Sequence, residues 1–485
     1  MLAGLVLAMF MSAIEGTIVA TAMPDIAASL GGFSLYAWVF AGYLLMQAVT
    51  TPLFGKAADL IGRKPVFVAG VSVFLIASIA CGLAPSMPWL IAFRLLQGIG
   101  AGAVQPVTAT LAGDLYAFHE RARVQGWLSS VWGVSALAGP LAGGLIVARF
   151  DWAWIFWANV PFGIVAIALI TRFLHEEVGR RSRSIDVVGV ATFTVATAAA
   201  IVLATQVATL PPLASVGLAA LSAAAFAAFL AHERRAAEPL IPPSLWSDPL
   251  VRWANLATLG AGAVMIAIAT YLPAYAQGVL GTSALVAGFT LTTMSMGWPL
   301  ASVAAGQVMT RVGPHRVARA GSLALLAGSL GFVALRPAFG PAYAAGASAL
   351  VGVGMGLLST TFIVAIQTRV DWARRGAATA TNLLMRFLGN ALGAALLGGI
   401  VNASLLAWLR AEGLGETVPL DDVARLLNGT LASGELDVGR IRGGLRLAID
   451  RAFVAMAVAA AATVLLAFRV PRLDPPQRDE QPTKR

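Results

Sequence analysis

One acidic residue lies inside an otherwise apolar stretch near the start of the chain and is the first candidate for chemistry. Glu15 interrupts the stretch from Leu2 to Ala22, which is long enough to cross a bilayer. An ionisable carboxyl at membrane depth costs about 2.5 to 3.5 kcal/mol on insertion scales, so it usually serves an ion or substrate pathway and has a partner. Arg94, within another apolar stretch, is the candidate partner. We therefore expect the pair to serve an ion or substrate pathway, in which Glu15 either takes up a proton or helps to hold the cargo.

The composition indicates that lipid is the main solvent of the chain. Of its 485 residues 58% are hydrophobic and 12% are charged, against about 25% charged in soluble proteins. About fourteen stretches are long and apolar enough to span a bilayer, which predicts an all-α polytopic membrane protein. They begin near Leu2, Tyr36, Val66, Pro88, Trp127, Trp152, Val187, Leu210, Asn255, Ala284, Ala318, Pro341, Ala377 and Phe453. The stretch from Ala284 is the weakest, because hydroxyl residues such as Thr290 and Thr293 interrupt it.

The distribution of the net charge of +10 argues against nucleic-acid binding and predicts the orientation in the bilayer. Alternate short loops hold about 18 cations, whereas the opposite short loops hold only Arg149 and Arg336. Cytoplasmic loops of membrane proteins carry such an excess of Lys and Arg, so we expect both termini in the cytoplasm. A cleaved signal peptide is the alternative for the first stretch, but it lacks a basic beginning and is too long.

The polar breaks divide the chain into four parts. We expect a six-helix bundle over residues 1–175, two inserted transmembrane helices with cytoplasmic linkers over 176–249, a second six-helix bundle over 250–470, and a cytoplasmic tail over 471–485. The spacing from Gly55 to Gly62 recurs from Gly306 to Gly313 in the corresponding later loop, which indicates two related halves around a central site.

A long hydrophilic segment, 403–451, interrupts the second half and should lie outside the cell. Its apolar residues, among them Val423, Leu427, Ile441 and Leu445, recur at helical spacing. A partly helical cap and a solvated loop are both compatible with this pattern.

Other classes of site find little support in the sequence. The four histidines fall in predicted cytoplasmic loops without the spacing of metal ligands, and the lone Cys81 has no partner for an internal disulfide. A Ser/His/Asp arrangement and a phosphate-binding loop followed by Lys-Ser/Thr are both missing. We therefore expect no enzyme, no metal and no cofactor, with protons as the coupling ion. A membrane-embedded enzyme or receptor would need a catalytic cluster at membrane depth, where Glu15 and Arg94 stand alone.

The predicted loop between the second and third spans carries a recognisable motif, Gly55-Lys56-Ala57-Ala58-Asp59-Leu60-Ile61-Gly62-Arg63-Lys64. It resembles the loop signature of the major facilitator superfamily, with Ala57 in place of Leu and Leu60 in place of an Arg. The resemblance implies that Asp59 pairs with neighbouring cations and a helix N-terminus to hold the cytoplasmic side shut. A simple orientation signal made of cations is the alternative. The resemblance thus gives a gating role to Gly55, Asp59, Gly62, Arg63 and Lys64.

Four further segments extend the resemblance over the first half. Arg94 to Gly102 is similar to an element of the superfamily in which the Arg is associated with proton transfer, and Gln97 lies on the same helix face. Gly139-Pro140-Leu141-Ala142-Gly143-Gly144 resembles the signature of its exporters, and the bend at Pro140 suits a pivot between halves. The segments from Glu15 to Ile26 and from Trp154 to Gly163 resemble those of fourteen-spanner drug:proton antiporters, with Glu15 in place of Asp and Ala20 in place of Asn. Gly139, Pro140, Gly143 and Gly144 are therefore expected to act in gating.

Polar, aromatic and Met residues at mid-span are the candidates for a substrate cavity. They are Met11, Tyr43, Gln47, Gln97, Asn159, Tyr271, Tyr275, Met294, Trp298, Phe362, Asn382 and Arg386. For each of them packing is the competing interpretation, and Arg386 could instead extend its cation to the membrane interface.

The resemblance implies a major facilitator fold with two six-helix bundles and two inserted helices, fourteen in all. It implies a proton-coupled exporter of hydrophobic or amphipathic compounds, cationic ones included, in the bacterial cytoplasmic (inner) membrane. We expect the bilayer and small amphipathic substrates as partners, and no nucleic acid. The protein should be a monomer, and whether it uses an external adaptor is left open. The alternatives on the same fold are a transporter of lipids or their precursors and a solute importer.

Overall fold

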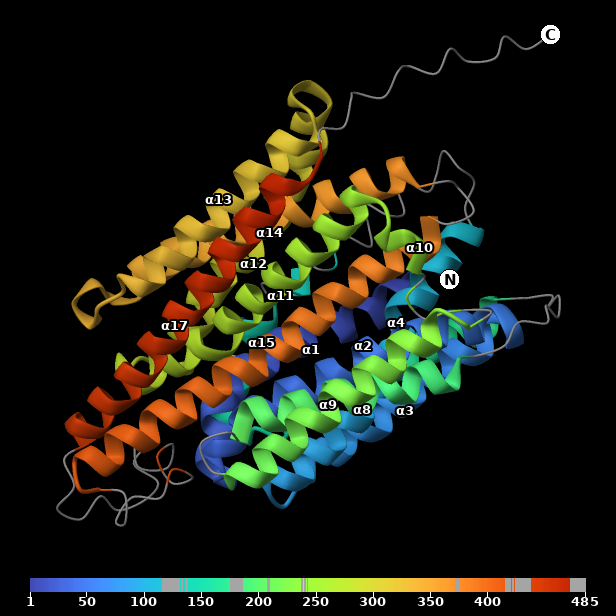
Figure 1. The fold of residues 1–485 in the computed structure, drawn as a ribbon. Coiled ribbons are helices and arrows are strands. Elements are labelled where there is room, and N and C mark those ends of the chain that lie inside the picture. Colours follow the sequence, from blue (N-terminus) through green and yellow to red (C-terminus); the bar gives the residue numbers. More distant parts are fainter. Residues whose placement is uncertain are drawn as a thin grey trace, which may run out of the picture.

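The computed structural model is a bundle of long helices that run roughly along one common direction (Figure 1). It describes residues 1–115, 131, 134–135, 138–174, 186–206, 210–236, 239, 241, 243–370, 375–414, 420, 423 and 438–471. The predicted all-helical architecture is confirmed for this part of the chain. In an apolar solvent each backbone polar group needs an internal partner, and a helix supplies it within one segment.

The first half and the pair predicted to be inserted contain eight labelled helices, besides one apolar helix in the fifth predicted span. These are α1 (Leu2–Leu30), α2 (Tyr36–Ile61), α3 (Arg63–Gly82), α4 (Met87–Leu115), α6 (Trp154–Trp157), α7 (Asn159–Phe173), α8 (Val187–Gln206) and α9 (Pro212–Glu233). The apolar helix Ala138–Arg149 is the described part of the fifth predicted span.

The second half follows a short helix, α10 (Pro243–Trp246). It comprises α11 (Pro249–Ala274), α12 (Ala284–Val312), α13 (Pro314–Val333), α14 (Gly340–Arg369), α15 (Arg375–Ala411) and α17 (Val438–Arg469). A π-helical turn, Tyr275–Val279, continues α11 beyond Pro273.

Twelve helices of the described residues are long and apolar enough to cross a membrane, so the predicted count of fourteen is not confirmed. The two stretches that fall outside this set are those near Trp127 and Ala284. Residues 127–130 and several of the next seven lie outside the described part, and the described helix Ala138–Arg149 is shorter than a span. The structure does not bear on which end faces the cytoplasm, so that orientation stays a prediction.

The stretch from Ala284 forms a helix of 29 residues in spite of its hydroxyl groups. Two of those groups are satisfied inside the helix, because Thr290 Oγ1 donates to the carbonyl of Ala287 at 2.6 Å and Thr292 Oγ1 to that of Gly288 at 3.0 Å. Thr293 Oγ1 also reaches the carbonyl of Ala345 on α14 at 2.7 Å. Hydroxyls bonded in this way lower the hydropathy of a segment without breaking its helix.

The two glycine-containing loops have matching geometry at their second glycine. Gly62, between α2 and α3, has φ 98° and ψ 153°, and Gly313, between α12 and α13, has φ 85° and ψ 150°. Residues with a side chain rarely adopt this region, so glycine is required at both positions. Gly55 and Gly306 lie on open helix surface, where an added Cβ would have no atom within 4 Å. The turn explains the second glycine of each repeat and leaves the first unexplained.

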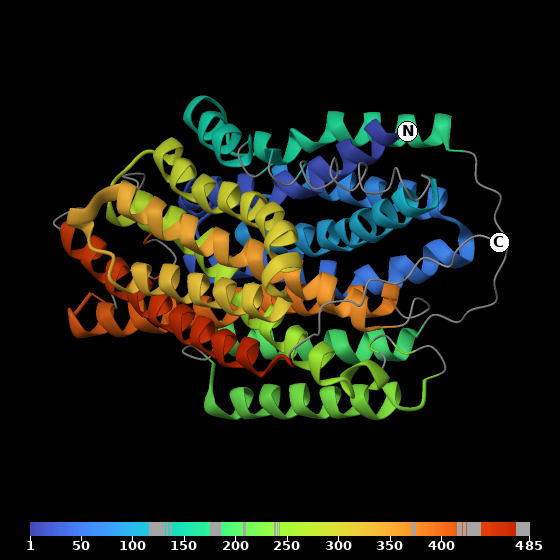
Figure 2. The same cartoon turned by 90° about the horizontal axis from the view of Figure 1, so that it is seen from above.

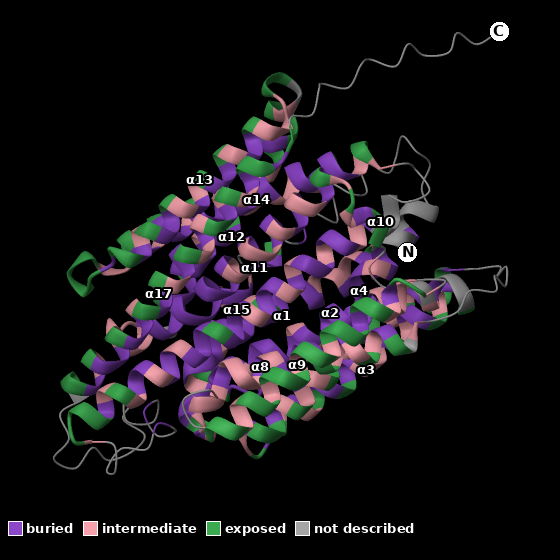
Figure 3. Ribbon diagram, in the orientation of Figure 1, coloured by how far each residue is buried: buried purple, intermediate pink, exposed green. Residues whose placement is uncertain are grey.

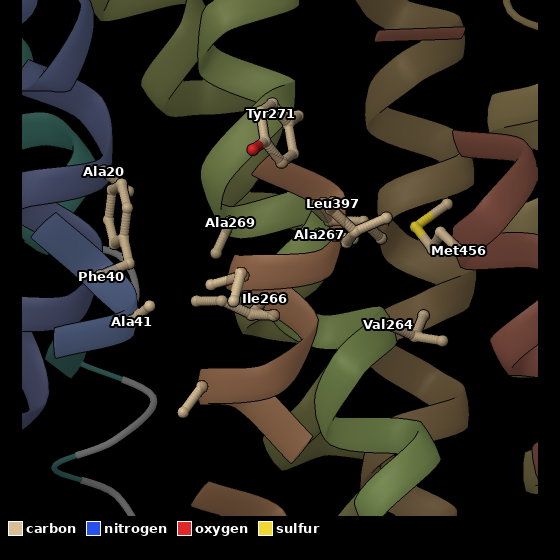
Figure 4. Packing of buried hydrophobic residues seen from close by; sticks show 14 of the residues in the cluster. Ala20, Phe40, Ala41, Val264, Ile266, Ala267, Ala269, Tyr271, Leu397 and Met456 are labelled. Carbon is tan, nitrogen blue, oxygen red and sulfur yellow. The ribbon is translucent and has the colours of Figure 1, made fainter. Parts of the chain in front are cut away.

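The two halves meet mainly through α2 and α15, at the end of the molecule that holds the α1–α2 connection. Tyr36 Oη donates to the carbonyl of Thr270 at 3.3 Å, and Asn402 Nδ2 to that of Ser34 at 2.7 Å. Gln277 Nε2 reaches the carbonyl of Thr21 at 3.1 Å. Apolar side chains continue this seam: Ala20, Phe40 and Ala41 lie opposite Ile266 and Ala269 (Figure 4).

The inserted pair, α8 and α9, lies along one side of this seam. α9 is on the outside of the bundle, with only 6% of its most apolar stretch buried (Figures 2 and 3). α8 packs against both α2 and α15. Trp38 Nε1 of α2 donates to Thr205 Oγ1 of α8 at 2.8 Å, while Gly399 of α15 has no side chain and so admits the carbonyl of Ala204. The pair therefore touches both halves.

Both ends of segment 403–451, which was predicted to form an external loop, are helical. α15 continues to Ala411, and α17 begins at Val438 rather than near Phe453. Ile441 and Leu445 are buried on α17, as their helical spacing suggested. Apart from residues 412–414, 420 and 423, the segment between the two helices lies outside the described residues.

Candidate functional site

The structure brings Glu15 and Arg94 together as a buried ion pair. Arg94 Nη1 lies 2.5 Å from Glu15 Oε1, and the two side chains are 1% and 0% exposed. The second carboxylate oxygen of Glu15 accepts a hydrogen bond from Asn159 Nδ2 at 2.5 Å. α1, α4 and the first turn of α7 supply the three residues. The predicted partner of Glu15 is therefore the observed one.

Arg94 is held by further contacts on its other side. Its Nη1 also donates to Gln97 Oε1 at 2.6 Å, its Nε donates to the carbonyl of Val39 at 3.1 Å, and its Cζ lies 4.1 Å from the ring centroid of Tyr43. Gln97 and Tyr43, expected in a substrate cavity, thus surround the guanidinium. A cation over an aromatic face contributes about 0.5 to 2 kcal/mol.

Behind Gln97 lies a layer that was not predicted from the sequence. Gln97 Nε2 donates to Ser78 Oγ at 2.7 Å, and Cys81 Sγ lies 3.9 Å from Gln97 Oε1. Both partners are on α3, three residues apart, so they share a helix face. This spacing was the only available signal, and it is common in apolar helices. The network joins α1, α2, α3, α4 and α7.

The charged form of the Glu15 carboxylate is stable at this depth only while Arg94 stays beside it. Breaking a buried pair by removing one partner costs about 3 to 5 kcal/mol, because the remaining charge is left uncompensated. Protonation of Glu15 would remove the charge without removing the side chain. Gly16, the next residue, is exposed, and a Cβ added there would have nothing within 4 Å, so open space begins one residue from the pair.

The glycines of the fifth span hold it tightly against α1. A side chain at Gly139 would overlap Thr17, and one at Gly143 would lie 3.0 Å from the carbonyl of Ile18. Pro140 contacts the other half, because its carbonyl lies 2.7 Å from where a Cβ of Gly288 on α12 would be. Gly144 is buried beside them. Of the predicted pivot residues, Pro140 therefore lies where the halves meet, while Gly139 and Gly143 pack against α1.

α15 repeats this arrangement against α11 in the second half. A Cβ at Gly389 would overlap the carbonyl of Leu259, and one at Gly393 would lie 2.6 Å from Cα of Ala263. The four-residue spacing is the same as that of Gly139 and Gly143. Small residues at this spacing let helix backbones approach closely. The sequence showed these glycines, but only the packing relates them to the fifth span.

A second polar group lies on α15 and faces α11 and α12. Asn382 Nδ2 donates to Asn255 Oδ1 at 2.9 Å and to Thr258 Oγ1 at 3.0 Å. One turn further on, the Cζ of Arg386 lies 5.7 Å from the ring centroid of Trp298 on α12. The structure thus pairs two predicted cavity residues, Arg386 and Trp298.

The remaining predicted cavity residues are buried in helix packing. Tyr271 stacks on Tyr36 with ring centroids 6.3 Å apart, and Tyr275 lies 6.1 Å from the ring of Phe453. The others of this kind are Met11, Gln47, Met294 and Phe362. A role for any of them in binding stays a prediction.

The loop with the superfamily motif is described in part. Lys64 Nζ donates to the carbonyls of Thr171 and Leu174 at 2.7 and 2.9 Å, and so fixes the start of α3 to the end of α7. Arg63 begins α3 beside it. The side chain of Asp59 lies outside the described residues, so its gating contacts stay a prediction.

The polar groups at the base of α8 and α9 form a separate cluster. Asp186 Oδ1 accepts hydrogen bonds from the N–H of Gly189 at 2.8 Å and from His232 Nε2 at 2.7 Å. Burial raises the pKa of Asp186, but these hydrogen bonds outweigh it and hold the pKa below its ordinary value. The cluster ties the ends of the inserted helices together. Within the described ranges, groups of three His, Cys, Asp or Glu that could hold a metal ion do not occur.

A pocket of about 640 Å³ opens between α8, α9 and α15, away from the ion pair. Its lining is apolar, with Leu203, Phe226, Leu396 and several alanines, and it includes none of the predicted cavity residues. It lacks the polar groups that fix the orientation of a specific ligand.

Comparisons with known proteins give the family of the chain. The model of the Major Facilitator Superfamily matches residues 5–394. The chain is 33% identical over 414 residues, 83% of this chain and 75% of the relative, to the multidrug transporter protein MdtP of Bacillus subtilis. It is 33% identical over 400 residues, 82% and 78% of the two chains, to multidrug resistance protein 3 of the same organism.

A solved structure shares the fold at low sequence identity. It is that of a bacterial homologue of the human lysosomal transporter Spinster, with a TM-score of 0.70, 17% identity and 98% of each chain covered. The family match covers well over half of the chain, and members of this family are transporters rather than enzymes. The chain is therefore a multi-pass membrane transporter that belongs to the Major Facilitator Superfamily.

Proposed function

We propose that the protein is a proton-coupled exporter of hydrophobic and amphipathic compounds that works by alternating access. The observation that carries the proposal is Glu15, fully buried with both oxygens bonded to Arg94 and Asn159. A charge at this depth is expensive, and such residues mark ion pathways and proton relays. The two Bacillus subtilis relatives are named for multidrug transport and resistance, which supports compounds of this class as cargo.

The proton acts by neutralising one side of the pair. Glu15 without its charge releases its hold on Arg94, which stays bonded to Gln97 and to the carbonyl of Val39. α1 is then free to move relative to α4. The binding of cargo compensates for the lost attraction between Glu15 and Arg94. An inward proton gains about 2.3 kcal/mol from 100 mV of membrane potential, and about 1.4 kcal/mol more from each pH unit. This is sufficient to drive export against a gradient.

The proposal includes the topology inferred from the charges. With the basic loops in the cytoplasm, the end at which α2 meets α15 is the outer one, so the structure represents an inward-facing state. We place the protein in the bacterial inner membrane as a fourteen-spanner of the drug:proton antiporter family. The helix containing Ala138–Arg149 and α12 would complete the count.

Transport by reconstituted vesicles tests the proposed function. Purified protein in vesicles should concentrate an amphipathic fluorescent dye when a pH gradient is imposed, and an ionophore that collapses the gradient should stop this. Uptake that ignores both pH and voltage would exclude proton coupling. Added lipids that compete with the dye would favour the lipid-transporter alternative instead.

Closure of the outer end gives a second test of alternating access. A Cβ added at Gly398 of α15 would overlap the Cβ of Ala37 on α2. Overpacking of this kind costs about 1 to 3 kcal/mol, so Gly398→Ala should slow pH-driven transport by about fivefold or more. Ala37→Gly combined with Gly398→Ala should restore the rate, since the pair then holds the same volume.

The matched control is Gly346→Ala on α14, where nothing lies within 4 Å of the added carbon. Its transport rate should equal that of the wild type. A Gly398→Ala protein with an unchanged rate, or a swapped pair that stays slow, would show that this contact does not form in the cycle.

A further inference from the structure

We propose that Arg386 and Trp298 form a recognition site for the negatively charged group of an amphipathic anion. The inference rests on the proposed transport function and names a substrate class for it. Arg386 Cζ lies 5.7 Å from the ring of Trp298 and 5.4 Å from that of Phe387, so the guanidinium lies close to two aromatic rings. Arginine next to aromatic surface suits a ligand that has a flat apolar body and a carboxylate, sulfonate or phosphate.

Arg386 is a cation without a counter-ion in the described part of the chain. Arg94 has Glu15, Arg369 has Asp248 at 2.9 Å, and Arg440 has Glu412, whereas the described contacts of Arg386 are with the rings alone. An unpaired charge at membrane depth is costly, so such a residue usually serves function. A transported anion would be the missing partner during each cycle.

The position of Arg386 argues against a cation that merely extends to the membrane interface. It lies eight residues into the span Ala378–Ala411, which is about 12 Å along the helix axis. Its neighbours Met385 and Phe387 are each 4% exposed, while Arg386 itself is only partly buried. Part of this side chain is therefore accessible between neighbours that are closed off.

The helices that carry the site also border the seam between the halves. The Arg386–Trp298 contact joins α15 to α12, which pack chiefly against α11 and α14. Three of these four helices, α11, α12 and α15, also contact the first half. Trp298 is held in place because its Nε1 donates to Ser359 Oγ on α14 at 3.2 Å. A ligand on the guanidinium would thus lie where alternating access must expose it.

Binding of two dyes with the same xanthene ring tests the inference. Fluorescein is an anion above neutral pH, and an esterified rhodamine is a cation. The affinity of each dye is measured by fluorescence anisotropy with the full-length protein in nanodiscs of zwitterionic lipid.

Arg386→Gln should weaken the binding of fluorescein about tenfold, equivalent to about 1.4 kcal/mol, and leave the binding of the rhodamine unchanged. Arg386→Lys should retain part of the affinity, because a point charge replaces a bidentate one. Trp298→Leu should weaken both dyes.

Arg319→Gln is the matched control, since Arg319 also lies over an aromatic ring, that of Phe468 at 4.8 Å, but at the start of α13. It should leave both affinities unchanged. The inference is overturned if Arg386→Gln weakens both dyes equally, if it weakens neither, or if Arg319→Gln has the same effect. Nanodiscs with added phosphatidylglycerol identify the source of the anion: competition with fluorescein assigns the site to a lipid headgroup, and its absence to a free compound.

The two proposals fail separately. If fluorescein binding depends on Arg386 but vesicles move neither dye in response to a pH gradient, the anion site stands and proton-coupled export is rejected. If vesicles accumulate dye in response to the gradient while Arg386→Gln binds fluorescein like the wild type, export stands and the anion site is rejected.

Discussion

Glu15→Gln is expected to abolish the uphill, pH-driven transport of dye by reconstituted vesicles. The amide occupies the same space between Arg94 and Asn159 but cannot exchange a proton. Because the imposed gradient would no longer act on the carrier, dye should only equilibrate across the membrane. The measurement is the ratio of dye concentrations inside and outside the vesicles as a function of the imposed pH difference. This ratio should rise with the pH difference for the wild type and stay constant for the variant.

Glu233→Gln is the matched control, because Glu233 is also buried, with 3% of its surface exposed. It lies away from the ion pair at the end of α9, where its Oε2 accepts a hydrogen bond from the N–H of Ile241 at 2.8 Å. Its coupling should be that of the wild type. A Glu15→Gln protein that still accumulates dye in proportion to the gradient would remove Glu15 from the proton pathway.

Arg94→Leu is expected to destabilise the folded protein by about 3 to 5 kcal/mol, because it leaves the Glu15 carboxylate buried without a cation. Gln97 and the carbonyl of Val39 lose their donor as well. The melting temperature of the purified protein in detergent measures the loss. Adding Glu15→Leu to Arg94→Leu should recover most of it, since replacing both ions by apolar residues of similar volume is often neutral.

Arg319→Leu on α13 provides the comparison, because this cation has a ring contact and no carboxylate partner among the described residues. Its loss should be about 1 kcal/mol or less, as for other cation–π contacts at exposed sites. If the double variant of Glu15 and Arg94 melts no higher than Arg94→Leu alone, the two residues do not act as a pair.

The sequence predicted the pair well because a charge in an apolar stretch is a rare signal. Glu15 and Arg94 were the only acidic and basic residues well inside the first six predicted spans, so pairing them needed no knowledge of the fold. Helix existence was equally accessible, since hydropathy alone decides it for long apolar stretches. The recurrence of Gly62 as Gly313 predicted two related halves, and the shared positive φ explains why both loops need this glycine.

Contacts between helices were not accessible in the same way. Asn159 and Gln97 looked like cavity residues because amides at mid-span are ambiguous until the neighbouring helix is known. For Ser78 the only signal was its three-residue spacing from Cys81, and a serine in an apolar helix usually bonds its own backbone. α12 was uncertain for a related reason: its hydroxyls lower the hydropathy, although those of Thr290, Thr292 and Thr293 each bond a carbonyl.

The position of α8 has a consequence for any opening of the end at which the halves meet. Thr205 holds α2 through Trp38, and the adjacent carbonyl of Ala204 lies against Gly399 of α15. The C-terminal end of α8 therefore contacts both halves, and the halves cannot separate at this end while both contacts persist. Opening of this end therefore requires that α8 leave either α2 or α15. The pair α8 and α9 would in this way restrain the separation of the two halves.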